Sequence, residues 1–223
     1  PNGPPQHHMG MSGGKAEGIA NSWEGLEVYT IGHSTRSVEE LVAALQSFGI
    51  DELIDIRTVP RSRHNPQFNK GSLPERLAGE GIRYLHLKEL GGLRHAKKDS
   101  PNDAWRNASF RGFADYMQTS EFAAALDELI DLARGEQIAI MCAEAVPWRC
   151  HRSLIADALT VRGIPVAHIM GPRSTQPHRM TPFAVVDGTE RWATDEFTPW
   201  DGQTLDIPLD KPADGYTKDG QPY

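Results

Sequence analysis

The stretch QIAIMCAEAVPWRCHRSLIADALTVRGIPVAHIM, residues 137–170, contains a strand, a helix and a second strand in succession. Its two ends, 137–142 and 164–170, are short apolar runs rich in isoleucine, valine and methionine, which favour extended structure. Between them, residues 153–161 carry apolar side chains at helical spacing. Two strands joined by a helix form a parallel pair with a right-handed crossover, so this stretch predicts an α/β fold.

The same alternation of strands and helices continues towards the amino terminus. Apolar runs alternate with segments that carry a helix-starting residue or helical spacing. The expected strands are 27–33, 53–57 and 82–87, and the expected helices begin at Ser37, at Ser72 and at residue 110, the last covering 110–134 with a break at Thr119–Ser120. This order predicts a three-layer α/β sandwich with a mostly parallel sheet of about five strands, covered on both faces.

The two ends of the chain differ in composition from its middle. Residues 1–27 combine Pro, Gly and His next to a Met, so we expect an expression scar or a disordered arm there. Residues 28–171 form the expected α/β domain. Residues 172–223 are rich in Pro, Asp and Gly and predict an irregular acidic extension, in which 183–186 is the one candidate for a short strand.

The net charge is concentrated at these ends. Residues 187–223 hold nine acids and three bases, whereas the central domain is close to neutral. The formal net charge of -7 therefore excludes neither a nucleic acid nor an anionic small molecule as a partner.

The cysteine count and the hydropathy bear on the compartment. Two cysteines in a chain of 223 residues do not make a disulfide-rich scaffold, so a reducing compartment is the simpler assumption. No stretch approaches the roughly 20 apolar residues that span a bilayer, and the start lacks the charged head and apolar run of a signal peptide. We therefore expect a cytoplasmic protein without membrane contact.

Residues capable of chemistry follow the expected strands at their carboxyl ends, where the loops of a parallel sheet gather and bind ligands. Cys142 ends one strand, and the loop after it leads into a helix whose free amide groups lower the pKa of a nearby thiol and attract anions. Glu144, His151 and, from another loop, His33 can move a proton. The sequence therefore predicts an enzyme with Cys142 as nucleophile or redox thiol.

Basic residues in the same loops favour a substrate that carries phosphate or carboxylate. The candidate substrate-binding residues are Ser34, Arg57, Arg61, Arg63, Asn65 and Arg152. A tyrosine-phosphatase mechanism is disfavoured, because Cys142 and Arg149 are one residue too far apart and because Glu144 would repel a bound phosphate. The sequence thus indicates a thiol-dependent hydrolase or transferase without naming its reaction.

Three alternatives compete with this interpretation. A cysteine at the end of an apolar strand is commonly just a small buried side chain. Cys142, Cys150 and His151 together offer the sulfur and nitrogen ligands that zinc prefers, so a metal ion is a candidate cofactor, although the thiol mechanism requires none. The loop 57–70 is basic and carries Phe68, so the protein could instead be a non-catalytic module that binds nucleic acid or a nucleotide.

Five segments carry a resemblance to a known family. They are TIGHS at 30–34, DIRTVPRSRHNPQFN at 55–69, LGGLR at 90–94, FRGFADYM at 110–117 and CAEAVPWRCHR at 142–152. In this order, over about two thirds of the chain, they resemble the domain-of-unknown-function 488 (DUF488) family. The resemblance marks as motif residues His33, Arg57, Arg61, Arg63, Asn65, Cys142, Glu144, Cys150, His151 and Arg152. It implies an architecture and a set of motif positions, but no agreed activity.

Overall fold

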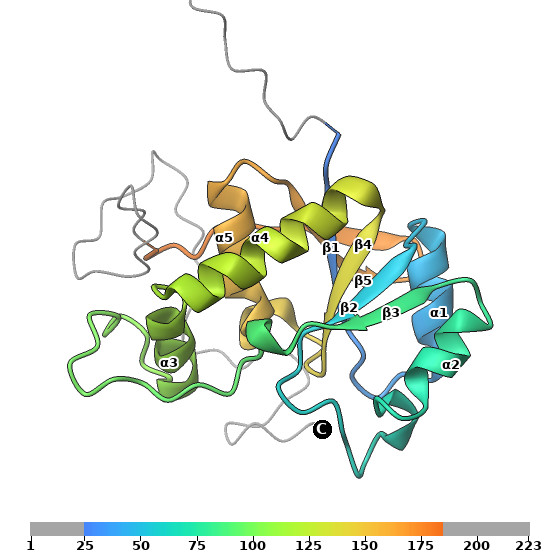
Figure 1. Cartoon of the computed structure of the whole chain (residues 1–223), viewed down its shortest axis with the longest axis horizontal. Helices are drawn as coiled ribbons and strands as arrows, with labels where there is room; N and C mark the ends of the chain where they lie inside the picture. The colour runs from blue at the N-terminus through green and yellow to red at the C-terminus, as the bar shows by residue number, and fades with distance from the viewer. Residues whose placement is uncertain (1–24, 185–223) are drawn as a thin grey trace, which may run out of the picture.

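The computed structural model describes residues 25–184 and confirms the α/β fold, with strands and helices in alternation (Figure 1). The strands are β1 (Val28–Gly32), β2 (Glu52–Asp55), β3 (Arg83–His86), β4 (Ile138–Cys142), β5 (Val166–Gly171) and β6 (Ser174–Pro177). The α-helices are α1 (Val38–Ser47), α2 (Leu73–Ala78), α3 (Ala108–Tyr116), α4 (Ser120–Gly135) and α5 (Arg152–Val161). Three short 3-10 helices are η1 (Pro66–Phe68), η2 (Lys88–Leu90) and η3 (Pro147–Arg149).

Six strands form one sheet in the order β3-β2-β4-β1-β5-β6. Neighbours among β1 to β5 are parallel, whereas β6 pairs antiparallel with β5 at the edge. The sheet therefore has one strand more than the expected five. All four residues of β6, STQP, are exposed, and its sequence shows no alternation of apolar and polar residues. The hydrophobic pattern therefore could not predict this strand.

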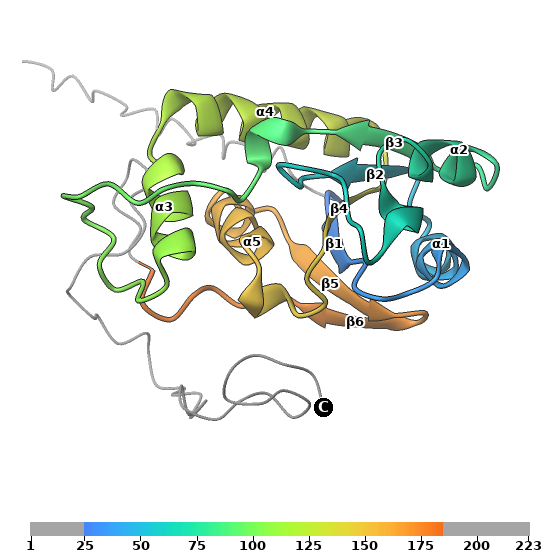
Figure 2. The same cartoon turned by 90° about the horizontal axis from the view of Figure 1, so that it is seen from below.

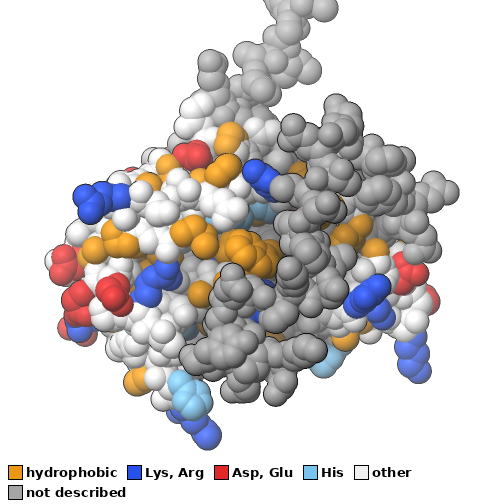
Figure 3. Space-filling model, turned by 180° about the vertical axis from the view of Figure 1, so that it is seen from behind, with side chains coloured by type: hydrophobic (Ala, Val, Ile, Leu, Met, Phe, Trp, Pro, Cys, Tyr) orange, Lys and Arg blue, Asp and Glu red, His pale blue; other side chains and the backbone are white. Residues whose placement is uncertain are grey.

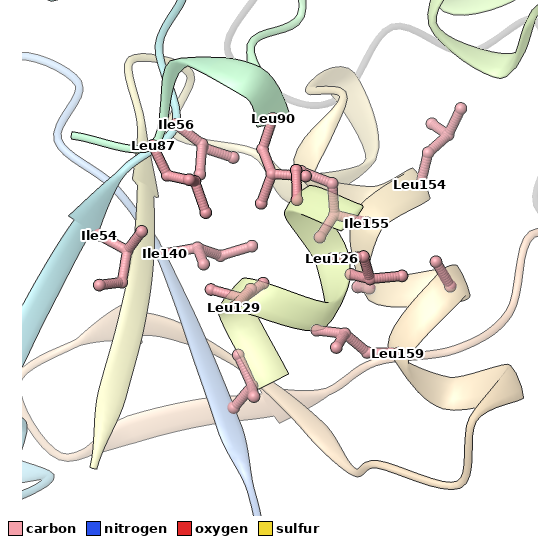
Figure 4. Close-up of a cluster of buried hydrophobic side chains, with 14 of the residues drawn as sticks. Ile54, Ile56, Leu87, Leu90, Leu126, Leu129, Ile140, Leu154, Ile155 and Leu159 are labelled. Carbon is pink, nitrogen blue, oxygen red and sulfur yellow. The ribbon is translucent and has the colours of Figure 1, made fainter. Parts of the chain in front are cut away.

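Helices cover both faces of the sheet, as the sandwich predicts (Figure 2). One face packs against α1 and α2, and the other against α3, α4 and α5. The side chains of β4 alternate between the two: Ile138, Ile140 and Cys142 face α4 and α5, while Ala139 and Met141 face α1. Figure 4 shows part of the apolar cluster on the α4 and α5 side, with Ile54, Ile56, Leu87, Leu90, Leu126, Leu129, Ile140, Leu154, Ile155 and Leu159.

The strand order determines where loops meet. The chain runs from β1 through α1 to β2 and β3, and it then returns through α4 to β4 and through α5 to β5, so the winding reverses between β1 and β4. The carboxyl ends of β2, β4 and β1 are adjacent, which brings the three loops after these strands together. Doubly wound sheets bind ligands in the crevice at such a reversal.

Local signals in the sequence set two of the helix starts. Ser37 caps α1: its hydroxyl accepts a hydrogen bond from the Glu40 amide, and the Glu40 carboxylate accepts one from the Ser37 amide. The Thr119 hydroxyl accepts a hydrogen bond from a backbone amide in the first turn of α4. The expected break at Thr119–Ser120 is therefore confirmed, because Thr119 starts a second helix there.

A chain of side-chain contacts connects the segment after β6 to the sheet and to α5. Thr30 Oγ1 lies 2.7 Å from His168 Nδ1, and His168 Nε2 lies 3.0 Å from His178 Nδ1. His178 Nε2 lies 2.8 Å from Asp157 Oδ1 in α5. Burial, together with the charges of His178 and Arg152, lowers the pKa of His168 to about 3, so this histidine is neutral in the folded protein.

Two expectations concern the carboxyl-terminal segment and the membrane. Of the expected short strand at 183–186, Phe183 and Ala184 lie in no strand, and the other two residues lie outside the described range. Among the helices of residues 25–184, none is long and apolar enough to cross a membrane.

Candidate functional site

A cavity of about 640 Å³ opens at the carboxyl edge of the sheet, where the loops after β1, β2 and β4 meet. Gly92 and Leu93, in the loop after η2, and Phe110, in the first turn of α3, line another part of its wall. The volume lies in the range of small-molecule sites. The fold therefore places a ligand-sized space at the reversal point of the sheet.

The cavity collects nearly all the residues singled out by the sequence. Its lining includes His33, Ser34, Arg57, Arg61, Asn65, Cys142, Glu144, Cys150 and His151. Arg63 is exposed on the loop after β2 and does not line it. Arg152 does not line it either: this residue is 1% exposed, and its guanidinium donates to the backbone carbonyls of Glu144 and Ala145. Arg152 thus holds the loop after β4 in place.

Cys142, Cys150 and His151 form a compact cluster in the cavity wall. Cys142 ends β4, Cys150 follows η3, and His151 directly precedes α5. The His151 Nδ1 atom lies 4.0 Å from Cys142 Sγ and 3.7 Å from Cys150 Sγ, and the three atoms lie within 4.8 Å of one another. Both cysteines are free and buried. Two sulfur atoms and one ring nitrogen therefore converge on one point.

Backbone and aromatic contacts orient the His151 ring. Its Nε2 lies 3.1 Å from the Leu90 carbonyl oxygen, which can only accept a hydrogen bond, so Nε2 carries the hydrogen. The other ring nitrogen, Nδ1, then faces the two sulfur atoms. Phe113 contacts the ring edge-on with centroids 5.0 Å apart, and a Cβ on Gly92 would lie 2.4 Å from Nδ1. A side chain at residue 92 would displace the ring.

The surroundings distinguish the two thiols. Burial raises the pKa of Cys150, but a hydrogen bond from Cys142 and the charge and backbone N–H of Arg152 outweigh it and bring the pKa down to about 7. The pKa of Cys142 is raised by its hydrogen bond to Cys150 and by burial. The sequence pattern gave the role of nucleophile to Cys142, whereas these surroundings favour the thiolate on Cys150.

Arg57 lies at the centre of a second polar group in the cavity wall. Its Nε and Nη2 atoms donate to the Asp55 carboxylate at 2.9 and 2.5 Å, and Nη2 also donates to the Phe68 carbonyl at 2.7 Å. Nη1 lies 3.1 Å from His33 Nε2. Asp55 in turn accepts a hydrogen bond from the Tyr84 hydroxyl at 2.7 Å. The charge of Arg57 is therefore compensated within the protein.

His33 is neutral in this arrangement. Its Nδ1 lies 2.9 Å from the Ser34 carbonyl oxygen and donates to it, so its Nε2 accepts from Arg57. Burial and, to a smaller extent, the positive charge of Arg57 lower the pKa of His33 to about 4, although the hydrogen bond to the Ser34 carbonyl raises it. Because both ring nitrogens are engaged, His33 is better suited to position Arg57 than to move a proton.

Close backbone packing sets the shape of the loop after β4. A Cβ on Gly32, the last residue of β1, would lie 1.9 Å from the Glu144 carbonyl oxygen, so the loop can approach β1 only because this residue is glycine. The Glu144 side chain accepts a hydrogen bond from the Val146 amide at 3.2 Å. Glu144 lines the cavity while supporting its own loop.

Several residues in or next to the cavity wall were not predicted from the sequence. Asp55, the buried partner of Arg57, could have been found as an acid at the end of an apolar strand, two residues before an arginine. Val59, Leu93 and Trp148 are the large hydrophobic residues exposed within the described range, at 59%, 73% and 56%. Val59 and Leu93 line the cavity, and Trp148 lies in η3 beside it. No periodicity marks them, because they lie on loops and on a single short turn.

One of three comparisons with known proteins gave a match. The family model described as Domain of unknown function DUF488 matches residues 37–159, which span both cysteines and most of the cavity loops. Neither the curated proteins nor the solved structures gave a match.

Proposed function

The chain belongs to the DUF488 family, and from this premise we propose that it is an enzyme that acts on an anionic substrate, with the Cys142–Cys150–His151 cluster as its reactive centre. The observation that carries the proposal is the convergence of two buried sulfur atoms and an oriented imidazole on a ligand-sized cavity. Structural cysteines have no need of an open space beside them, whereas a reactive centre requires one.

The charges around the cavity support an anionic substrate. Arg61 is exposed at the cavity and forms no ion pair with any described residue, in contrast to Arg57. Arg149 also lines the cavity, and the amino terminus of α5 lies behind Cys150. An oxyanion bound near Arg61 would gain charge-assisted hydrogen bonds without first breaking an internal pair.

The exposed apolar side chains refine this expectation. Val59 and Leu93 line the cavity, and Trp148 precedes the cavity residue Arg149 in η3; all three leave large apolar surfaces in water. Exposed apolar groups gathered at a concave site are typical of ligand binding. The proposed substrate therefore combines an acidic group with a flat or bulky apolar part.

Binding of phenyl phosphate and of inorganic phosphate, followed by calorimetry, tests the proposal with a matched pair of variants. Arg61→Ala removes a charge from the cavity wall, and Arg63→Ala removes the same charge from the same loop outside the cavity. We expect Arg61→Ala to weaken phenyl phosphate binding about ten-fold, the loss of one charge-assisted hydrogen bond, and Arg63→Ala to leave it unchanged. Equal effects of the two variants would count against a substrate site in the cavity.

A second candidate function, a nucleic-acid-binding module, is favoured by the exposure of Trp148, which offers a ring for base stacking. Figure 3 shows one face of the molecule, on which the visible Lys and Arg side chains lie apart from one another with acidic side chains among them, so the visible part of that face offers no continuous basic patch. A phosphate backbone contacts many cations at once, so this function predicts that Arg61→Ala and Arg63→Ala weaken oligonucleotide binding equally and that affinity falls steeply with salt.

A further inference from the structure

We propose that Cys142 Sγ, Cys150 Sγ and His151 Nδ1 bind a single Zn²⁺ ion, with the fourth coordination position open to the cavity. The inference specifies how the reactive centre of the proposed function works, and it rests on that function only for the idea that the cluster is reactive. Two thiolates and one imidazole are a ligand set that zinc sites with an open position use.

The distances fit a tetrahedral ion. Zinc–sulfur bonds of about 2.3 Å and zinc–nitrogen bonds of about 2.0–2.1 Å at tetrahedral angles place sulfur and nitrogen about 3.6 Å apart. His151 Nδ1 lies 3.7 Å from Cys150 Sγ and 4.0 Å from Cys142 Sγ. The same geometry places the two sulfurs about 3.8 Å apart, within the 4.8 Å that encloses the cluster. The nitrogen–sulfur distances therefore need movements of a few tenths of an ångström, and the two sulfurs need to approach by at most about 1 Å.

The second ring nitrogen of His151 is held in the manner of metal-binding histidines. Such residues donate their other N–H to a carbonyl or carboxylate, which fixes the tautomer and turns the free lone pair towards the ion. The His151 Nε2 contact with the Leu90 carbonyl oxygen does this, at 3.1 Å. Gly92 leaves the room that the ring occupies. The donor is thus oriented by groups outside the cluster.

Charge balance also favours a dication. Cys142 and Cys150 are both buried, and two thiolates side by side in such a place require a positive charge next to them. Arg57 is already paired with Asp55, and Arg152 lies beside Cys150 but donates to loop carbonyls, so two thiolates need more positive charge than these two guanidinium groups supply. When Zn²⁺ binds, each thiol releases its proton to solvent and a zinc–sulfur bond forms, so the site becomes neutral without any oxidation or reduction.

The open position gives the ion access to the cavity. All three ligand residues line the same space as Arg61. A water molecule or an oxygen of an anionic substrate can complete the tetrahedron there, and a zinc ion in this role lowers the pKa of its bound water or polarises the substrate. The site therefore has the layout of a catalytic metal centre, in contrast to a closed structural one.

Cobalt binding to the full reduced chain tests the site, because Co²⁺ takes the place of zinc and reports its ligands by colour. We expect one Co²⁺ per chain, with thiolate-to-cobalt charge-transfer absorption and the strong visible bands of four-coordinate cobalt, all abolished by Zn²⁺. Cys142→Ser, Cys150→Ser and His151→Gln should each weaken Co²⁺ binding at least about ten-fold, and the two serine variants should also reduce the charge-transfer band.

Two controls exclude binding elsewhere. His64→Gln replaces an exposed histidine of the loop after β2 and should not change the spectrum. Replacing His7 and His8 together removes the paired histidines near the start of the chain and should also leave the charge-transfer band intact. A band that persists in Cys142→Ser and Cys150→Ser, or a wild-type spectrum without it, overturns the proposal.

A measurement on the wild-type chain covers the case in which the variants fail to fold. Bound Zn²⁺ should protect both cysteines from iodoacetamide, and a chelator should restore their reaction; alkylation at the same rate with and without Zn²⁺ overturns the site. The proposed function fails separately: if phenyl phosphate binding does not depend on Arg61 while the cobalt spectrum is as expected, the metal site stands and the substrate assignment is wrong.

Discussion

Two buried polar groups share one cavity wall but differ in how their members are satisfied. Around Arg57, donors and acceptors are matched within the protein, by Asp55, His33 and the Phe68 carbonyl. In the cysteine cluster, Cys142, Cys150 and His151 direct their donor atoms at one another and at the cavity. The hydrogen bonds of the first group are complete within the protein, as expected for a structural group, while the second group leaves room for a ligand. Polar burial alone thus does not identify a reactive centre. Donor atoms that converge on an open cavity do.

The largest expected loss of stability comes from removing the carboxylate that pairs with Arg57. Asp55→Ala leaves the Arg57 guanidinium buried without its carboxylate, and removing one partner of a buried pair costs about 3–5 kcal/mol. We expect the free energy of unfolding in urea to fall by this amount. Glu39→Ala, which removes the exposed partner of Arg76, should leave the midpoint unchanged. An Asp55→Ala protein as stable as the wild type would show that the Arg57 group does not support the fold.

A smaller loss of stability is expected from adding a side chain next to the cysteine cluster. Gly92→Ala places a Cβ against the His151 ring, and such overpacking costs about 1–3 kcal/mol. The variant should also lose affinity for Co²⁺, because Nδ1 moves away from the sulfurs. Gly71→Ala, with nothing within 4 Å of its new Cβ, is the matched control and should stay within about 0.5 kcal/mol of the wild type. Unchanged cobalt affinity in Gly92→Ala would contradict the role given to the ring orientation.

Within the cluster, the two cysteines should react unequally once metal is removed. Iodoacetamide alkylation of the chelator-treated, reduced protein, followed by peptide mass spectrometry, should give Cys150 an apparent pKa of about 7 and Cys142 a higher one. At neutral pH the rates should differ about ten-fold, because only the thiolate reacts. In urea the two rates should converge. Faster alkylation of Cys142 at neutral pH would show that the more acidic thiol is Cys142 and not Cys150.

Buried neutral histidines should make the stability of the protein depend gradually on pH. Histidines of the unfolded chain bind protons near their ordinary pKa of 6.5, whereas burial keeps the pKa of His33 at about 4 and that of His168 at about 3. Between pH 6.5 and these lowered pKa values, the unfolded state binds more protons than the folded state. The free energy of unfolding therefore has its full value above about pH 6.5 and declines as the pH falls towards about 4. Urea unfolding across this range measures the slope.

Replacing each histidine shows whether these two residues cause the pH dependence of the free energy of unfolding. His33→Gln and His168→Gln should each make the decline shallower, even if the variants are less stable at neutral pH. A slope that is the same in both variants and in the wild type would mean that other groups carry the acid sensitivity.

Several features of the protein follow from the sequence by itself. Apolar runs and helical spacing predicted the strands from β1 to β5, the capping residue Ser37 predicted the start of α1, and the break at Thr119–Ser120 was predicted without its cap. These signals are local, because hydrogen bonding and side-chain periodicity within one element set them. The rule that ligands bind at the carboxyl ends of parallel strands then selected most residues of the cavity.

Only the tertiary structure decided what those residues do. Arg61 lies in the loop after β2 and Arg152 is the first residue of α5, yet Arg152 is turned inward to hold carbonyls of the loop after β4 and Arg61 faces the cavity. His33 directly follows β1 and His151 directly precedes α5, and packing places His33 against Arg57 and His151 against two cysteines. The direction of a side chain depends on partners far away in the chain, brought close by the strand order, and no local pattern encodes those partners.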